Sequence, residues 1–473
     1  MQLVAYGAQD IYLTGNPQIT FFKVVYRRHT NFAMEAIEQT LNGSVGYGNK
    51  VTATIARNGD LVGRMYLEYT QSETDATATA NPGSALIDNI TLEIGGQQID
   101  KHYGHWMEAY AELTESNPTG ANPLCADVPV NSSSATSFTE FQRMSGMGGV
   151  LGATDTMEKL FIPLQFFFCR NPGLALPLIA LQYHEIKINI EFNTANHCIM
   201  NSVSNPSIIA KMKTCSLFVD YIYLDTDERK RFAQSSHEYL IEQLQFTGAE
   251  SISSTNEKIK LNFNHPIKEI IWVVSKNEVA NYTNKQWFNF TDKVDTTHGS
   301  GVVMDPLGNG MIDGILGSAS GDVSLGSSNS ALASNWASGL VSNLALIGGG
   351  IAPTSESFNV FDQGLNPVIS ARLQLNGHDR FAERNGRYFN LVQPYQHHKN
   401  VPSTGINVYS FALNPEDHQP SGTCNFSRID ASALILNLTN SAIANGGSKV
   451  YVFAVSYNIL RIMSGMGGLA YTN

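Results

Sequence analysis

The sequence predicts an all-β protein built from two similar β-sandwiches in tandem. Three observations predict it. Apolar residues alternate with polar ones, as half-buried strands require. Gly and Asn turn signals separate these runs, at Asn58-Gly59, Gly95-Gly96, Asn376-Gly377 and Asn385-Gly386. No segment carries an apolar stripe of helical period over several turns. The clearest alternating runs are residues 186–192, 259–263 and 369–375, and short helices are expected only at 106–113 and 225–233.

The two halves of the chain resemble each other. Residues 90–100 align with residues 371–381, and each segment is an alternating strand that leads into a glycine turn. Two weaker pairs follow in the same order, residues 172–192 with 420–438 and residues 219–229 with 450–461. With 473 residues the chain is also longer than one hydrophobic core usually supports. Two tandem sandwiches are therefore the simplest interpretation.

The charged run from Asp225 to Phe232 is the expected boundary between the halves. Asp225 or Thr226 can cap a short helix, and the acidic first turn suits the helix dipole. The Asp-Thr-Asp triplet here could alternatively bind a metal ion, but a solvated connector is the expected role. The predicted division is an N-terminal arm at 1–33, a first sandwich at 34–224, a linker with a short helix at 225–236 and a second sandwich at 237–473.

Composition and charge favour a component of an assembly. Charged residues make up only 15% of the chain, against about 25% in ordinary soluble domains, so much of the surface is expected to contact other chains. The net charge of −11 argues against a protein that coats nucleic acid, because phosphate binding depends on clustered Lys and Arg. The five cysteines contain no C-x-x-C pair and are expected as reduced thiols. No secretory signal or membrane span is recognisable.

Two long segments are expected to be surface loops. They cover residues 115–156 and 296–367, and the second is rich in Gly, Ser and Asn. It also contains no Lys or Arg, which argues against a phosphate-binding loop. Loops of this length in an all-β protein are usually functional or packed on a neighbour.

No compact catalytic constellation is present, since P-loop, H-E-x-x-H and G-x-S-x-G motifs are all missing. His102 with His105, and His397 with His398, could each offer two imidazoles to a metal ion. Surface histidines are the simpler expectation. We therefore predict no catalytic residue, no cofactor and no metal site, and no enzymatic activity.

Two further features of the sequence allow a structural or a modified role. Asn281 and Asn289 begin N-x-[ST] sequons and are candidate glycosylation sites. The hexapeptide Met-Ser-Gly-Met-Gly-Gly occurs twice, at 144–149 and 463–468. Because glycine lets backbones approach closely, a turn or a packing contact is the expected role of this repeat.

Distinctive sequence blocks occur in order along nearly the whole chain. They are residues 3–23, 25–32, 92–102, 172–185, 261–266, 375–381, 419–430 and 458–471. The first reads LVAYGAQDIYLTGNPQITFFK and the last reads NILRIMSGMGGLAY. Together they resemble the major capsid proteins of nucleocytoplasmic large DNA viruses, a group that includes phycodnaviruses, iridoviruses, mimiviruses and marseilleviruses. The resemblance implies a double jelly roll of two eight-stranded antiparallel sandwiches. It also implies a pseudo-hexagonal homotrimer, or capsomer, many copies of which tile an icosahedral shell.

The resemblance also implies partners and a location. The expected partners are neighbouring capsomers, minor capsid, cap and penton proteins, and an inner viral membrane, without sequence-specific binding to nucleic acid. The protein would be made and assembled in the host cell cytoplasm and reside in the virion. The arm would lie on the inner side of the shell, where Lys23, Arg27 and Arg28 could contact minor capsid proteins or the membrane. Pairing of these cations with acidic groups inside the trimer is the alternative.

Two other classes of protein share some of these signals. A jelly-roll carbohydrate-binding protein or a cupin-like metalloenzyme would also be all-β, but would need a converging His/Glu cluster or an aromatic binding face. A penton or other minor capsid protein typically resembles a single jelly roll, whereas this chain is repeated.

Overall fold

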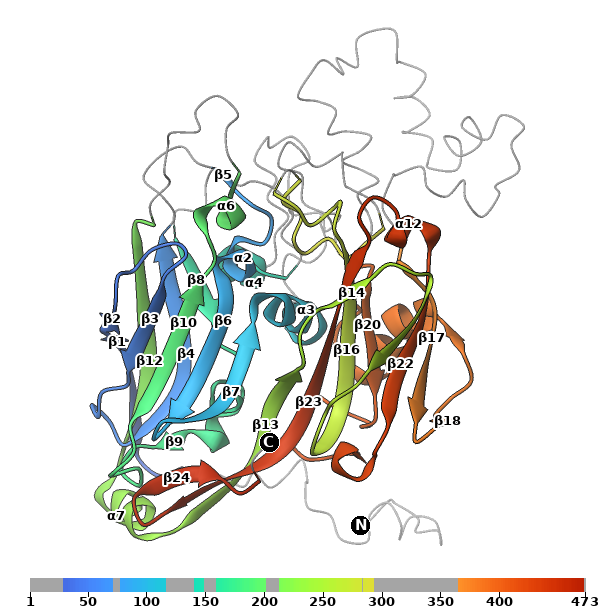
Figure 1. Cartoon of the computed structure of the whole chain (residues 1–473). Helices are drawn as coiled ribbons and strands as arrows, with labels where there is room; N and C mark the ends of the chain where they lie inside the picture. Colours follow the sequence, from blue (N-terminus) through green and yellow to red (C-terminus); the bar gives the residue numbers. More distant parts are fainter. Residues whose placement is uncertain are drawn as a thin grey trace, which may run out of the picture.

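The computed structural model describes residues 29–70, 77–115, 140–148, 159–200, 212–282, 284–292 and 365–471. Within them, two β-sandwiches stand side by side, and every strand pairing is antiparallel (Figure 1). The architecture is a double jelly roll, so the predicted fold class is confirmed.

The first jelly roll carries its strands in two main sheets. The strands are β1 (Phe32–Gln39), β2 (Leu41–Asn42), β3 (Lys50–Thr54), β4 (Leu61–Thr70), β5 (Thr77–Ala78), β6 (Ile87–Ile94), β7 (Gln97–Tyr103), β8 (Leu160–Pro163), β9 (Leu176–Pro177), β10 (Ile186–Phe192), β11 (Ile199–Met200) and β12 (Thr214–Leu224). Short helices lie between them: α2 (Pro82–Leu86), α3 (Gly104–Thr114), α4 (Glu140–Ser145), α5 (Phe167–Arg170), η1 (Pro172–Leu174) and α6 (Ala195–Cys198).

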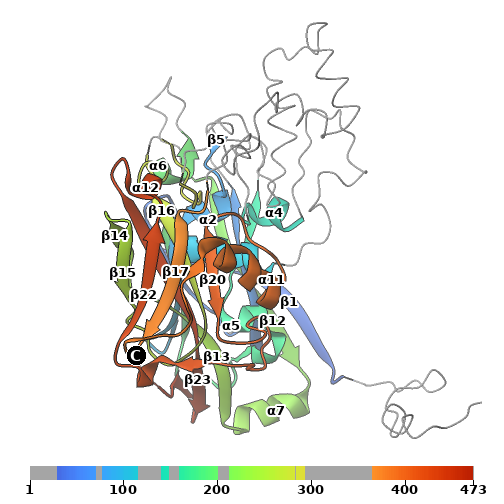
Figure 2. The same ribbon diagram turned by 90° about the vertical axis from the view of Figure 1, so that its right-hand side faces the viewer.

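The second jelly roll follows helix α7 (Thr226–Gln234), which lies at the base of the molecule below β12 and β13 (Figure 2). Its strands are β13 (His237–Phe246), β14 (Glu250–Ile252), β15 (Asn256–Lys260), β16 (Pro266–Lys276), β17 (Val368–Leu375), β18 (His378–Asp379), β19 (Arg384–Asn385), β20 (Ile406–Ser410), β21 (Cys424–Asn425), β22 (Ser432–Leu438), β23 (Ser448–Met463) and β24 (Met466–Leu469). Its helices are the π-helix η3 (Tyr388–Val392), α11 (Gln393–His397), η4 (Phe426–Arg428) and α12 (Asn440–Ile443).

The two jelly rolls repeat the same strand order. One sheet runs β1-β12-β4-β8 in the first jelly roll and β13-β23-β16-β20 in the second. The other sheet contains β3-β10-β6-β7 in the first and β15-β22-β17-β18 in the second. The aligned segments 90–100 and 371–381 fall on the equivalent pairs β6–β7 and β17–β18. The internal repeat expected from the sequence is therefore confirmed as a repeated topology.

Alternation of side chains builds the cores. In β10, Ile186, Ile188, Ile190 and Phe192 are buried, and the polar residues between them are only half-buried. Successive side chains of a strand point to opposite faces, so this pattern places one face on the sandwich interior. Full burial of each such side chain contributes about 1.5–3 kcal/mol relative to exposure.

Two of the four predicted turns use the left-handed backbone region. Gly95 and Gly96 join β6 to β7 with φ of 60° and 82°, and Asn376-Gly377 joins β17 to β18 with φ of 50° and 81°. Gly59 and Gly386 do not take positive φ. Gly386 is needed for close approach, because an added Cβ would lie 1.9 Å from the Val368 carbonyl oxygen.

Both copies of the repeated hexapeptide form turns. In the first copy, Gly146 has φ of 63° and its carbonyl oxygen accepts from the backbone N–H of Gly83 at 3.1 Å. In the second copy, Ser464 and Gly465 form the turn between β23 and β24, with φ of 52° and 81°. The expectation of a turn or packing contact is confirmed.

The β23–β24 hairpin reaches from the second jelly roll to the first. Figure 1 shows β24 running beneath the first jelly roll. There the backbone N–H of Tyr183 donates to the Gly465 carbonyl at 3.0 Å, and Gly467 N–H donates to His184 Nδ1 at 3.2 Å. The hairpin thus fastens the two jelly rolls together.

Candidate functional site

Charged side chains are buried where the two jelly rolls meet. Arg170 comes from α5 of the first jelly roll, Glu242 from β13, and Lys268 and Glu269 from β16. The side chains of Lys268 and Glu269 are each 1% exposed, and that of His398, just after α11, is 0% exposed. Burial of charge is costly unless the charge is paired. The geometry of the pairs therefore decides the role of the cluster.

Glu242 bridges cations from both jelly rolls. Its Oε2 lies 2.8 Å from Arg170 Nη1, and its Oε1 lies 2.7 Å from Lys268 Nζ. Arg170 Nη1 also donates to the Tyr110 hydroxyl at 2.6 Å. Burial raises the pKa of Tyr110, so this phenol stays neutral. The arrangement ties α3 and α5 of the first jelly roll to β13 and β16 of the second.

His398 lies between two carboxylates. Its Nε2 is 3.0 Å from Glu269 Oε2, and its Nδ1 is 3.2 Å from Glu416 Oε1. Burial alone would lower the pKa of His398, but the charges of Glu269 and Glu416 outweigh burial and raise it to about 9. Burial opposes the charge of Glu269, yet His398, Lys268 and Arg170 lower its pKa overall. His398 is therefore a cation at neutral pH, and it lies between the carboxylates of Glu269 and Glu416.

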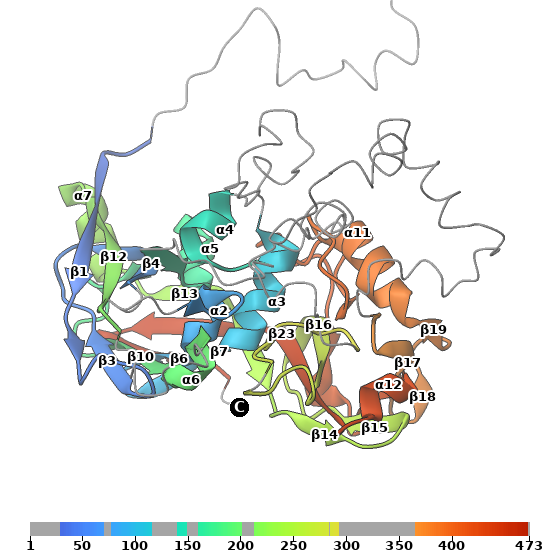
Figure 3. The same ribbon diagram turned by 90° about the horizontal axis from the view of Figure 1, so that it is seen from above.

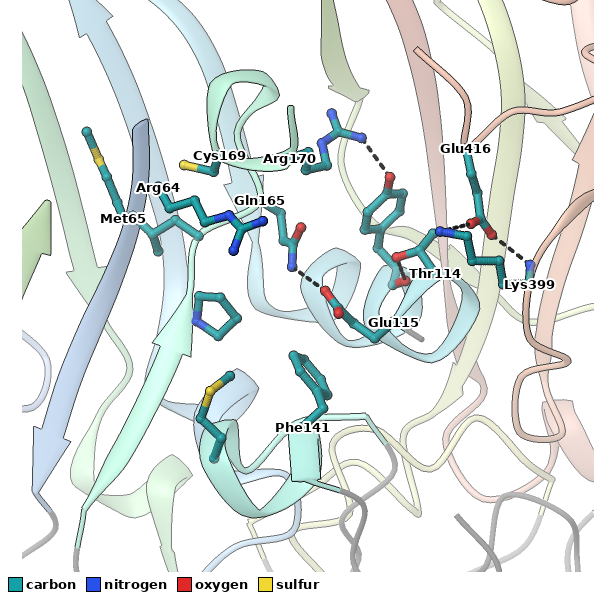
Figure 4. Close-up of a pocket in the computed structure, with 14 residues that line it drawn as sticks. Arg64, Met65, Thr114, Glu115, Phe141, Gln165, Cys169, Arg170, Lys399 and Glu416 are labelled. Atoms are coloured by element: carbon teal, nitrogen blue, oxygen red, sulfur yellow. Dashed lines mark hydrogen bonds and ion pairs between the residues drawn. The ribbon is translucent and has the colours of Figure 1, made fainter. Parts of the chain in front are cut away.

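A cavity of about 470 Å³ adjoins this cluster (Figure 4). Arg64 and Gln165 border it from the first jelly roll, and Lys399 and Glu416 border it from the second. Its polar groups largely pair among themselves: Gln165 Nε2 donates to Glu115 Oε1 at 2.9 Å, and Lys399 Nζ lies 3.3 Å from Glu416 Oε2.

The cavity holds no activated nucleophile among its described lining residues. Cys169 borders it, but burial raises the pKa of this thiol to about 12, so the reactive thiolate is suppressed. The paired charges and the protonated thiol suit a structural junction better than a reaction centre.

The expected surface histidines are in fact buried at His102 and His398, so that expectation was wrong for both. His102 Nε2 contacts Asp100 Oδ2 at 2.9 Å, and its ring lies 4.6 Å from the Phe166 ring. His105 stacks on Tyr451 of the second jelly roll at 4.6 Å, and burial lowers its pKa to about 4. His105 is therefore a neutral imidazole that packs between the two jelly rolls.

No group of three or more His, Cys, Asp or Glu side chains could hold a metal ion within the described ranges. The Asp225 carboxylate instead caps α7, where it accepts from the Thr226 backbone N–H at 2.7 Å. None of the described helices is long and apolar enough to cross a membrane.

The two candidate glycosylation sites differ in accessibility. Asn281 is half-buried, and its Nδ2 donates to the Glu278 carbonyl at 2.7 Å. Asn289 is only 6% exposed, and its Nδ2 donates to Gln286 Oε1 at 2.8 Å. This geometry disfavours a glycan on Asn289 in the folded chain. The predicted contact residues Lys23, Arg27 and Arg28 lie outside the described residues.

Sequence reasoning missed the buried charge cluster. One signal was present: Lys268 and Glu269 interrupt the apolar run at 267–274, and a charged pair inside such a run is buried only if it is paired. A second signal was Arg170, which lies within the most apolar stretch of the chain. Neither signal identifies partners that lie far away along the chain.

Comparison with known proteins covers almost the entire chain. The family model described as major capsid protein N-terminus matches residues 20–225, and that described as large eukaryotic DNA virus major capsid protein matches residues 228–468. The major capsid protein of Phaeocystis pouchetii virus is 47% identical over 528 residues, covering 100% of this chain and 99% of the relative. The major capsid protein of Paramecium bursaria Chlorella virus 1 is 41% identical over 500 residues, with the same coverage of both chains.

Solved structures agree with these matches. The protein of the PBCV-1 virus capsid has 37% identity and a TM-score of 0.66, covering 96% of this chain and 100% of its own. The Faustovirus major capsid protein has 12% identity and a TM-score of 0.62 over 97% of this chain and 94% of its own, which supports the fold alone. The paired jelly rolls and their structural counterparts define a structural protein of a viral shell. The chain belongs to the family of major capsid proteins of large eukaryotic DNA viruses.

Proposed function

We propose that this capsid protein forms pseudo-hexagonal homotrimers that tile the icosahedral shell of a large double-stranded DNA virus. The observation that carries the proposal is the repeated strand order of the two jelly rolls. A subunit with two similar sandwiches presents six of them when three copies form a ring, and six similar units suit hexagonal packing. The match to PBCV-1 capsid protein over 96% of the chain supports the same proposal.

The absolute mass of the purified chain in solution tests this proposal. Light scattering coupled to size exclusion is expected to give three times the chain mass of 51.7 kDa. Negative-stain images of the same peak are expected to show a hexagonal outline. A compact monomer that does not assemble over a wide range of concentration and salt would contradict the proposal.

The proposed partners are neighbouring capsomers, minor capsid, cap and penton proteins, and an inner viral membrane, with synthesis and assembly in the host cell cytoplasm. We propose no enzymatic activity, since the described cavity pairs its charges and keeps its thiol protonated. The net charge of −11 supports the absence of sequence-specific nucleic-acid binding.

The proposed division is an arm at 1–33, a first jelly roll at 34–224, a linker at 225–236 and a second jelly roll at 237–473. Helix α7 lies between β12 and β13, which supports the linker at 225–236. Strand β1 begins at Phe32, two residues before the proposed start of the first jelly roll. Lys23, Arg27 and Arg28 are proposed inner-face contacts. Replacing all three by Glu should weaken binding of the assembled chain to anionic vesicles, and unchanged binding would contradict a membrane contact.

A further inference from the structure

Arg64 borders the cavity at the junction of the jelly rolls and has no hydrogen-bond or ion-pair partner in the described part of the chain. On β4, Arg64 is exposed, whereas its neighbours Gly63 and Met65 are buried. Because successive side chains of a strand point to opposite faces, Arg64 points away from the core of the first jelly roll. Figure 4 shows its guanidinium group turned toward Gln165 and the interior of the cavity. This group therefore has donors available for a ligand.

The other charged side chains that line the cavity are already engaged. The ion pairs described above hold Arg170 and Lys399. The Glu115 carboxylate accepts from the Gln165 amide at 2.9 Å. Among the described residues that line the cavity, Arg64 is thus the charged group that an incoming anion can bind without breaking an existing ion pair.

Two carboxyl groups near Arg64 limit the charge that the ligand can carry. Burial raises the pKa of Glu115 and of Asp220, and the charge of Arg64 opposes this rise in both cases. A dianion at Arg64 would meet repulsion from both carboxylates, and a monoanion would meet about half as much. The site therefore favours a singly charged ligand.

An apolar wall accompanies this cation. Phe141 and Met144 of α4 and Pro163 of β8 border the cavity. Phe141 and Pro163 are half-buried, and Met144 is 41% exposed. Seen from above, α4, α5 and α11 lie along one side of the molecule, and residues in or next to these three helices line the cavity (Figure 3). Its volume of about 470 Å³ falls within the range of about 300–1,000 Å³ that is typical of small-molecule sites.

We infer that this cavity binds a small organic monocarboxylate, whose apolar body packs on the wall of Phe141, Met144 and Pro163 while its carboxylate pairs with Arg64. The planar guanidinium offers two parallel N–H donors to a carboxylate, which adds geometric selection to the attraction of charge. Burial of an aromatic or aliphatic body against the wall adds a hydrophobic contribution. The inference does not depend on the proposed homotrimer, because every group in it belongs to one chain.

Benzoate is the probe, and isothermal titration calorimetry of the full purified chain at pH 7 is the assay. Saturable binding of one benzoate per chain is expected. Benzamide has nearly the same shape but no charge, so it should bind at least about tenfold more weakly. Inorganic phosphate should also bind more weakly than benzoate, because Glu115 and Asp220 repel its second charge and it has no apolar body.

Substitution and chemical protection locate the bound carboxylate. Arg64→Gln should weaken benzoate binding at least about tenfold, and Arg64→Lys should fall between this variant and wild type, because Lys keeps the charge without the planar fork. The matched control is Arg428→Gln, which alters an exposed arginine of η4 and should keep the wild-type affinity. All three variants should keep the wild-type near-ultraviolet circular dichroism, because both arginines are exposed. In the wild type, benzoate should protect Arg64 from modification by phenylglyoxal, as read by mass spectrometry of its peptide.

Three results would overturn the inference. The first is a wild-type chain that shows no saturable binding of benzoate at millimolar concentration. The second is equal affinity for benzoate and benzamide, or binding that Arg64→Gln leaves unchanged, because the carboxylate would then not contact Arg64. The third is an oligomer that Arg64→Gln dissociates while the wild type binds no benzoate, which would assign Arg64 to a contact between copies of the chain.

Discussion

Replacing His398 by Gln should destabilise the subunit through the two carboxylates that the imidazolium neutralises. His398 lies 3.0 Å from Glu269 and 3.2 Å from Glu416, and its side chain is fully buried. Gln is neutral and has a single donor nitrogen, so it cannot serve both carboxylates with charge. Removing one partner of a buried ion pair typically costs about 3–5 kcal/mol. We expect the free energy of unfolding to fall by about this amount at pH 7. The remaining charges of Lys268 and Lys399, which face the same two carboxylates, should make the fall somewhat smaller.

The pH dependence of stability gives an independent measure of the same contact. The folded-state pKa of His398, raised to about 9, exceeds the ordinary value of 6.5. The stabilisation is therefore fully present below about pH 6.5 and is lost as the pH rises through about 9. The difference between the two pKa values corresponds to about 3 kcal/mol at most. Wild type should lose stability across this window, and His398→Gln should lack this component.

Denaturant unfolding of the full chain between pH 6 and pH 9.5 measures both effects. His378→Gln is the matched control, because His378 is an exposed histidine on β18 of the same jelly roll. The control should follow the wild-type curve. A variant His398→Gln that unfolds within about 1 kcal/mol of wild type at pH 7, or that keeps the wild-type pH slope, would refute the assignment of a buried cation at this position.

Three further changes test other parts of the structure. Gly405→Ala should lower the free energy of unfolding by at least about 2 kcal/mol, because φ is +103° and the new Cβ would lie 2.2 Å from the Phe290 carbonyl oxygen. The control Gly96→Ala also has positive φ, but its new Cβ would lie in open space, so it should lower the free energy of unfolding by only about 1 kcal/mol in the same assay. Tyr221→Phe should cost about 1–2 kcal/mol, because the buried hydroxyl donates to the Ala56 carbonyl at 2.6 Å, and an unchanged unfolding midpoint would rule this contribution out. Thiol labelling at pH 8 should modify at most two of the five cysteines before denaturation, because burial raises the thiol pKa of Cys169, Cys198 and Cys215. Mass spectrometry that finds any of these three labelled before denaturation would contradict the prediction.

Local patterns were sufficient to predict β10 and the cap of the linking helix, whereas the predicted strand at 259–263 overlaps only the end of β15 (Asn256–Lys260). The alternation of residues 186–192 predicts β10, because period-2 burial depends only on neighbours along the strand. Asp225 caps α7 as expected, since a capping carboxylate bonds to the adjacent backbone. The repeat of residues 90–100 at 371–381 predicts two similar domains, because homologous segments adopt equivalent strands.

The junction between the jelly rolls was beyond local patterns. The buried His398 pairs with Glu269 of β16, which lies far earlier in the chain. No local sequence signal joins the two residues. His102 was expected on the surface, but the Phe166 ring from a separate segment covers it. Gly386 was expected only as part of a turn signal, whereas its small size is needed where the Val368 carbonyl approaches. Each of these errors concerns a contact between distant segments, which patterns along the chain do not encode.

The β23–β24 hairpin imposes an order on the maturation of the subunit. β23 lies between β13 and β16 in its sheet, and its turn holds the first jelly roll at Tyr183 and His184. Strands β23 and β24 are translated after every other described strand, and domains generally fold as they emerge from the ribosome. The first jelly roll can therefore fold early, but the second remains open until synthesis passes Leu469. A chain that terminates before Ser448 lacks both a central strand of the second jelly roll and the hairpin that contacts Tyr183 and His184, so neither the complete sheet nor this link between the jelly rolls can form.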